Sequence, residues 1–146
     1  MTQESRLLIG VLRQAVAGKE EVLSLQVDWD KFVLLAQQHS LLPLMYNGLH
    51  RNDSDWMQIP QKVRDILQKS FFSAIYQDAQ MEHLQIKLQN ALVDAGTAHI
   101  FLKGTVLKYN YPVPALRTMG DMDLLVHPCM QRSNTERRTH IELAPI

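Results

Sequence analysis

The chain has 146 residues, 46% of them hydrophobic and 21% charged, which is typical of a globular chain with one core. Its 15 basic and 15 acidic residues cancel, and no Lys/Arg cluster precedes the tail, so we expect no tight nonspecific binding to nucleic acid. The N-terminus has no basic n-region and no apolar run of about 18 residues occurs, so we expect a cytoplasmic protein without a membrane span, which the single cysteine, Cys129, also allows.

Hydrophobic residues at helical spacing predict four helices before the first strand. Pro43 is tolerated in the first turn of the third helix, and Gly18 and Gly96 are suited to end the first and the last. Asp28 or Asp30 can cap the second helix. The predicted helices cover about residues 5–17, 29–38, 41–49 and 60–95.

The last of these helices is long, and its apolar residues recur every three or four positions, which predicts one buried face. Asp78 interrupts that apolar stripe. The polar stretch 51–55 before it is predicted to be a loop. We expect four side chains of the long helix to face the core: Leu67, Phe71, Leu84 and Leu88.

Two short apolar runs follow the helices and are predicted to be strands buried on both faces. The first, 100–102, stops at Lys103-Gly104-Thr105, where a helix can begin with Thr105 at or near its N-cap. The second, 124–126, is headed by Asp121 and Asp123. Because side chains alternate along a strand, both carboxylates should point to one face, about 6 to 7 Å apart. Two carboxylates so placed can share a Mg²⁺ ion.

This order of strand, Gly-Thr turn, helix and Asp-x-Asp strand resembles the DNA polymerase beta-like nucleotidyltransferase superfamily, which has Gly-Ser followed by an acidic pair. Residues 28–127 are more closely similar to a bacterial family described as uncharacterised nucleotidyltransferases. The shared features are Lys103-Gly104, Tyr111-Pro112 and the segment RTMGDMDLLV at 117–126. The resemblance implies an α+β fold, in which an N-terminal helical bundle precedes a partial nucleotidyltransferase-like sheet.

The resemblance also implies transfer of a nucleotidyl group from an NTP to an acceptor, whether a protein, a small molecule or RNA. In that reading Asp121 and Asp123 are catalytic and hold Mg²⁺ or Mn²⁺ on the triphosphate. Gly104 and Thr105 bind a phosphate at the helix start, and Lys103 and Arg117 flank this anion site. Structural alternatives stay open for each group. Asp121 and Asp123 can form a solvated strand end, Gly104 and Thr105 a plain strand-to-helix turn. Lys103 and Arg117 can be solvated surface cations.

We divide the chain into a helical region (1–96), the start of the nucleotidyltransferase core (97–128) and a polar tail (129–146), which is too polar to form a core element. The superfamily carries a third carboxylate on a neighbouring strand. Glu142 is the downstream candidate, but only 18 residues separate it from Asp123, which is tight for a strand, a helix and a return. We therefore expect a truncated family member with little or no activity. The alternative is a non-catalytic remnant that binds NTP or another protein.

Overall fold

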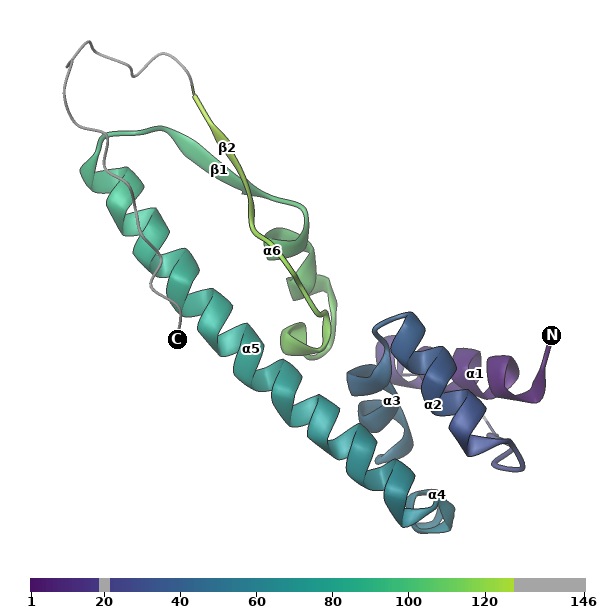
Figure 1. Ribbon diagram of the computed structural model, residues 1–146. Coiled ribbons are helices and arrows are strands. Elements are labelled where there is room, and N and C mark those ends of the chain that lie inside the picture. Colours follow the sequence, from purple (N-terminus) through teal and green to yellow (C-terminus); the bar gives the residue numbers. More distant parts are fainter. Residues whose placement is uncertain (19–21, 128–146) are drawn as a thin grey trace.

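The computed structural model describes residues 1–18 and 22–127. Within these ranges five helices come first: α1 (Gln3–Ala17), α2 (Trp29–Gln38), α3 (Leu42–Leu49), α4 (Asp53–Gln58) and α5 (Gln61–Asp94) (Figure 1). They are followed by β1 (His99–Leu102), α6 (Gly104–Leu107), the 3-10 turns η1 (Lys108–Asn110) and η2 (Pro114–Leu116), and β2 (Asp123–Val126). The α+β fold with a partial sheet is confirmed. The predicted tail, with Cys129 and Glu142, lies outside the described residues, and the proposed domain boundaries stay a prediction.

Several helix ends follow directly from local sequence chemistry. Of the two candidate caps for α2, Asp28 is the one used, because its side chain accepts a hydrogen bond from the backbone N–H of Lys31 at 3.2 Å. Gly18 and Gly96 both have positive φ, at 66° and 63°, where glycine is not hindered by a Cβ. The predicted ends of α1 and α5 are thus confirmed.

The predicted loop at 51–55 is wrong, because α4 begins within it. Asn52 caps this helix by accepting a hydrogen bond from the backbone N–H of Ser54 at 3.0 Å. Asp53 and Asp55 lie in the first turn, where negative charge interacts favourably with the helix dipole. The polar residues that suggested a loop are therefore the residues that start a helix.

The hydrophobic core lies between α1, α2, α3 and the first part of α5, with α3 packed between α1 and α5. From the C-terminal part, Leu116 of η2 joins this cluster and so attaches the segment before β2 to the helices. Leu67 is completely buried in the core, and Phe71 is half-buried against it, as predicted. Buried hydrophobic members of the cluster are Leu7, Leu8, Val11, Ala15, Phe32, Ala36, Leu44, Met45, Leu49, Ile59, Val63, Leu67 and Leu116.

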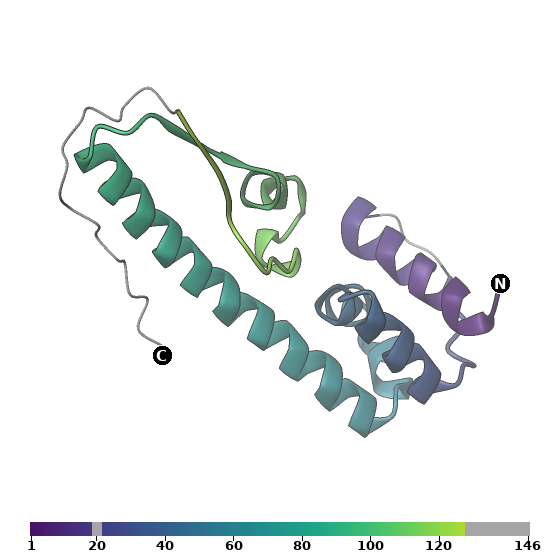
Figure 2. The same ribbon diagram turned by 45° about the horizontal axis from the view of Figure 1, so that its top comes forward.

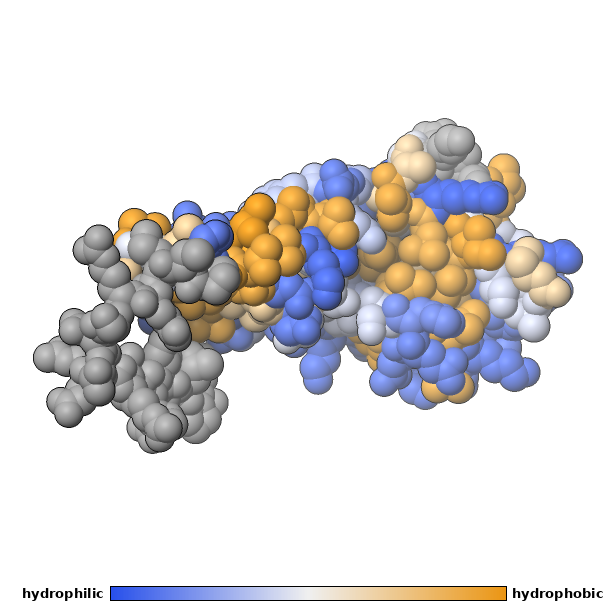
Figure 3. Space-filling view, turned by 90° about the horizontal axis from the view of Figure 1, so that it is seen from above, coloured by the Kyte–Doolittle hydropathy of each residue, from blue (hydrophilic) through white to orange (hydrophobic). Residues whose placement is uncertain are grey.

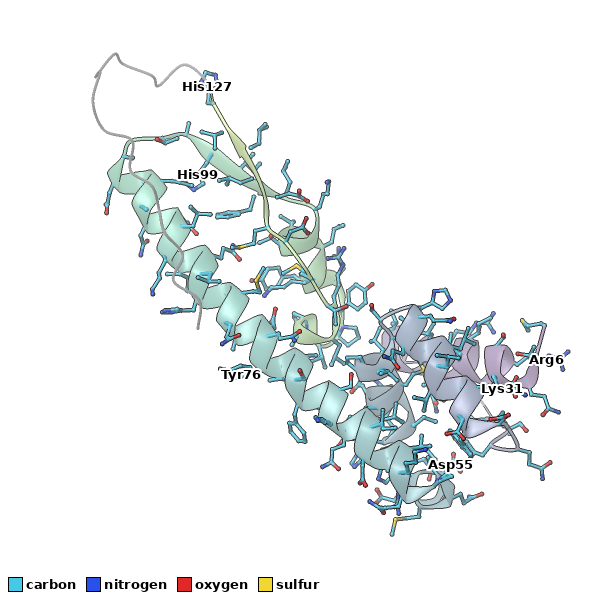
Figure 4. All side chains as sticks on the ribbon, in the orientation of Figure 1. Arg6, Lys31, Asp55, Tyr76, His99 and His127 are labelled. Carbon is cyan, nitrogen blue, oxygen red and sulfur yellow. The ribbon has the colours of Figure 1, made fainter. Side chains whose placement is uncertain are left out.

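The second half of α5 extends beyond this core and runs beside the sheet, as the two ribbon views agree (Figures 1 and 2). Leu84 and Leu88 lie in this half and are half-buried outside the core cluster, so their predicted place in the core is wrong. The reason is the length of α5, whose 34 residues exceed what the three N-terminal helices can cover. Tyr76 is exposed and points away from the sheet (Figure 4).

The two strands form an antiparallel pair in which Leu102 lies opposite Asp123 and Ile100 opposite Leu125. The prediction that both strands are buried on two faces is wrong, since Ile100 and Leu125 are 56% and 59% exposed. In the described part of the chain the sheet has two strands, and α5 runs along one side of it. Hydrophobic residues therefore reach the surface, as the orange atoms in Figure 3 show.

Candidate nucleotide-binding site

The turn between β1 and α6 consists of Lys103, which has φ 46° and ψ −113°. A residue with a Cβ rarely adopts this conformation, and holding it there is strained. The surrounding hydrogen bonds fix it, because the Lys103 carbonyl accepts from the N–H groups of Val106 at 3.1 Å and Leu107 at 2.8 Å. Such strain is concentrated at functional sites in proteins, which favours a role for this turn beyond connecting two elements.

Lys103 contacts the acidic end of β2. Its Nζ lies 3.2 Å from Oδ2 of Asp123, and both side chains are accessible to solvent. The antiparallel register explains the contact, since Leu102, directly before Lys103, pairs with Asp123. An ion pair this exposed contributes little to stability, and its two charges remain available to other partners. The sheet thus brings together two residues that the sequence separates by 20 positions.

The two aspartates differ in their placement. Asp123 is the first residue of β2, and alternation along the strand puts it on the same face as the exposed Leu125. Asp121 is exposed and precedes the strand, so strand alternation does not determine its direction. That the carboxylates of Asp121 and Asp123 point to the same face therefore stays a prediction.

The donor set of the two aspartates suits one particular mode of metal binding. In residues 1–18 and 22–127, no three His, Cys, Asp or Glu side chains gather into a group that could hold a metal ion. Mg²⁺ in nucleotide sites is commonly held by one or two carboxylates together with phosphate oxygens and water, rather than by a complete protein cage. Two solvent-accessible aspartates fit a Mg²⁺ ion that arrives with a nucleotide.

Gly104 allows a close approach of Arg117. A Cβ at position 104 would lie 2.8 Å from Nη1 of Arg117 and 2.9 Å from Sδ of Met119, so these two flexible side chains would have to shift. The absence of a side chain therefore lets the Arg117 guanidinium lie directly against the turn. Lys103, Gly104 and Arg117, predicted from the sequence as neighbours of one anion site, are brought together.

Thr105 is the second residue of α6 rather than its cap, a position that Lys103 takes. The side chain is buried, and its Oγ1 has no hydrogen-bond partner among the described residues. This hydroxyl keeps an unfilled hydrogen-bonding capacity beside the turn, and its predicted contact with phosphate stays a prediction.

A buried ion pair behind the turn was not predicted from the sequence. Lys108, which follows α6, is 2% exposed, and its Nζ donates a 2.8 Å hydrogen bond to Oδ1 of Asp78 on α5. Burial alone would lower the pKa of Lys108, but the hydrogen bond and negative charge of Asp78 outweigh it and the pKa is raised. The available signal was Asp78 itself, a charge inside an otherwise apolar stripe.

A cleft runs from this region along α5. Next to Asp78 a narrow hollow is lined by Arg117, Thr118 and Met119. It shares Thr118 with a cleft of about 540 Å³, which continues toward α2 and α3 and is lined by polar residues such as Lys69 and Ser73. This cleft reaches Thr118, the residue after Arg117, and has a size in which proteins bind small molecules, but neither Lys103 nor the two aspartates line it.

These features define a class: a helical region, then a strand, a Lys-Gly turn, a short helix and a strand headed by an acidic pair, which is the motif order of nucleotidyltransferases. The chain belongs to the family described as uncharacterised nucleotidyltransferase, which matches residues 26–136. The match continues past residue 127, where the motifs had placed the end of the resemblance. No curated protein and no solved structure gives a significant match.

Family membership supports a general function in nucleotidyl transfer. No helix in the described ranges is long and apolar enough to cross a bilayer.

Proposed function

We propose that the chain binds an NTP with Mg²⁺ or Mn²⁺ between the Lys103 turn and the Asp121/Asp123 pair, and transfers the nucleotidyl group to an acceptor hydroxyl. The observation that carries this proposal is the 3.2 Å contact between Lys103 and Asp123. In this proposal Lys103 is the cation for the phosphates and Asp123 a carboxylate for the metal, and their contact supports it because a metal–nucleotide complex needs both kinds of group side by side.

Each residue has a distinct task in this proposal. Asp121 and Asp123 would hold the metal, which would supply positive charge against the negative charge that develops as the acceptor oxygen, its hydroxyl proton passing to water, attacks the α-phosphorus and pyrophosphate leaves. Lys103 turns from Asp123 to a phosphate oxygen, and the backbone N–H groups at Gly104 and Thr105 face the same anion. Arg117, half-buried against the turn, offers two parallel N–H groups to phosphate.

The acceptor enters, in this proposal, through the cleft along α5 that ends at Thr118. Lys69 and several hydroxyl and amide side chains line it beside apolar residues, so it offers an acceptor both hydrogen-bonding groups and apolar contact.

The test is calorimetric titration of Mg²⁺–ATP and Mg²⁺–GTP into wild type and the Asp121→Asn, Asp123→Asn double variant. Losing both carboxylates should weaken the complex by about tenfold or more, because groups that hold or orient a bound metal typically contribute this much. The Asp53→Asn, Asp94→Asn variant removes the same charge from exposed positions and should bind as wild type does. Equal binding of the Mg²⁺–nucleotide complexes by all three proteins would refute the proposal.

Labelled NTPs offered with protein and RNA acceptors in a cell extract test the chemical step separately. Transfer that requires Asp121 and Asp123 supports catalysis. Tight Mg²⁺–NTP binding without transfer to any acceptor supports the alternative, a non-catalytic nucleotide-binding protein of the same family.

Lys103 offers a further test, because its charge and its backbone strain can be separated. Lys103→Ala and Lys103→Gly both remove the ammonium, so both should weaken Mg²⁺–ATP binding to a similar degree. Glycine adopts φ 46° without a Cβ clash, so Lys103→Gly should be more stable than Lys103→Ala by about 1 kcal/mol. Urea denaturation measures the difference. Equal stability of the two variants would show that the turn is not strained.

A further inference from the structure

Lys108 and Asp78 form a charged pair that is largely shielded from solvent. Lys108 is 2% exposed and Asp78 16% exposed, with 2.8 Å between Nζ and Oδ1. The Tyr109 ring also lies near the ammonium, its centroid 5.3 Å from Nζ. An ammonium group enclosed in this way is not available to a bound phosphate, so any effect of Lys108 on the site must pass through other residues.

The pair lies where it connects α5 to the turn. Lys108 comes five residues after Lys103, with only α6 between them, whereas Asp78 is near the middle of α5. Asp78 also lines the narrow hollow with Arg117 and Met119, the two residues that press against Gly104. One carboxylate on a long helix thus bonds the residue that follows α6 and shares a narrow hollow with Arg117.

Stability alone does not account for such a pair. Removing two charges from water is costly, and buried ion pairs can often be replaced by apolar residues of similar size without loss of stability. The ion pair includes a directional hydrogen bond. This bond fixes the distance and orientation of α5 relative to the segment after α6 more narrowly than apolar contact does. The side chains that form a binding site must be held to within about 0.5 Å of the geometry that binds the ligand.

We propose that Asp78 and Lys108 are positioning residues, which anchor the Lys103–Gly104 turn and Arg117 to helix α5 in the geometry that binds the NTP phosphates. This inference rests on the proposed function, because it assumes that the turn binds those phosphates. It predicts that the pair matters for the nucleotide and not for the metal, since the groups that it anchors are the turn and Arg117 and not the carboxylates of the two aspartates.

Three variants test the inference: Asp78→Asn, Lys108→Met, and the apolar double variant Asp78→Leu, Lys108→Met. Asp94→Asn removes an exposed carboxylate from the same helix and is the matched control. Titrations with Mn²⁺ alone and with Mn²⁺–ATP are performed at a temperature at which circular dichroism shows every protein to be folded. If a single variant does not fold, the apolar double variant provides the comparison.

We expect the folded variants to bind Mn²⁺–ATP about tenfold more weakly than wild type, as is typical when residues that orient a binding group are lost, and Mn²⁺ alone within twofold. The apolar double variant should show this loss even where its stability equals that of wild type. Unchanged Mn²⁺–ATP affinity in a folded variant would overturn the positioning role and leave the proposed function intact. An equal loss for Mn²⁺ and Mn²⁺–ATP would also overturn it, since the whole site would then have changed. Wild type that binds no Mn²⁺–ATP would refute the proposed function and the inference together.

Discussion

Replacing Leu67 by alanine is expected to lower the free energy of unfolding by about 2–5 kcal/mol, because it empties a fully enclosed site in the core. Leu67 is 0% exposed and lies in the cluster that α5 shares with the N-terminal helices. Leu34→Ala is the matched control, since the same side chain on α2 is 56% exposed and should change stability by less than about 0.5 kcal/mol. Urea denaturation followed by circular dichroism measures both values.

An unchanged urea midpoint for Leu67→Ala would mean that α5 does not pack on α3 as described, and the helical core would have to be rebuilt. Phe71 gives a graded comparison. Its ring is half-buried, 4.6 Å from the ring of Tyr46 between centroids, and it lies at the margin of the cluster. Phe71→Ala should therefore destabilise less per atom removed than Leu67→Ala does.

The helices could be predicted because their signals are local. Apolar spacing, a capping aspartate such as Asp28 and a glycine with positive φ such as Gly96 all act within a few residues. Which other elements bury a helix face cannot be predicted from such local signals. The apolar stripe of α5 indicates which face is covered but not by what, and Leu84, although half-buried, is not part of the core cluster.

The same distinction explains the strands and α4. Apolar runs predicted the strands correctly, but their exposure depends on how many strands and helices surround them, which no local pattern records. At α4 two interpretations of one polar segment compete, since Asn and Asp favour both loops and helix starts. The contact of Asn52 with Ser54 decides in favour of the helix.

Within the candidate site, residues close in sequence or shared by the family motif could be named in advance, as Lys103, Gly104, Arg117 and Asp123 were. The contact of Asp78 with Lys108 spans 30 residues, and nothing near either residue specifies the other. A charge that breaks an apolar helix stripe, as Asp78 does, is a signal that a buried partner should be sought.

The buried pair itself is the source of the other large expected effect. Lys108→Met leaves the Asp78 carboxylate, 16% exposed, without its partner. Removing one member of a buried ion pair costs about 3–5 kcal/mol, and the partial exposure of Asp78 places the expected loss near the lower figure. The Asp78→Leu, Lys108→Met variant should recover most of it, because no unpaired charge remains. Urea denaturation at pH 7 measures both variants, and full stability in Lys108→Met would contradict the buried pair.

The stability that the Lys108–Asp78 pair contributes should decrease at alkaline pH. The pKa of Lys108 is raised above its ordinary value of 10.5, despite the opposing effect of burial, because Asp78 stabilises the charged form. The contribution of the pair is therefore complete below pH 10.5 and is lost as the pH rises through the higher pKa of the folded protein. Wild type should lose stability relative to the apolar double variant in this alkaline range, while their difference should stay constant between pH 7 and 9. A difference that does not change up to pH 12 would mean that the Lys108 ammonium contributes no charge-dependent stability.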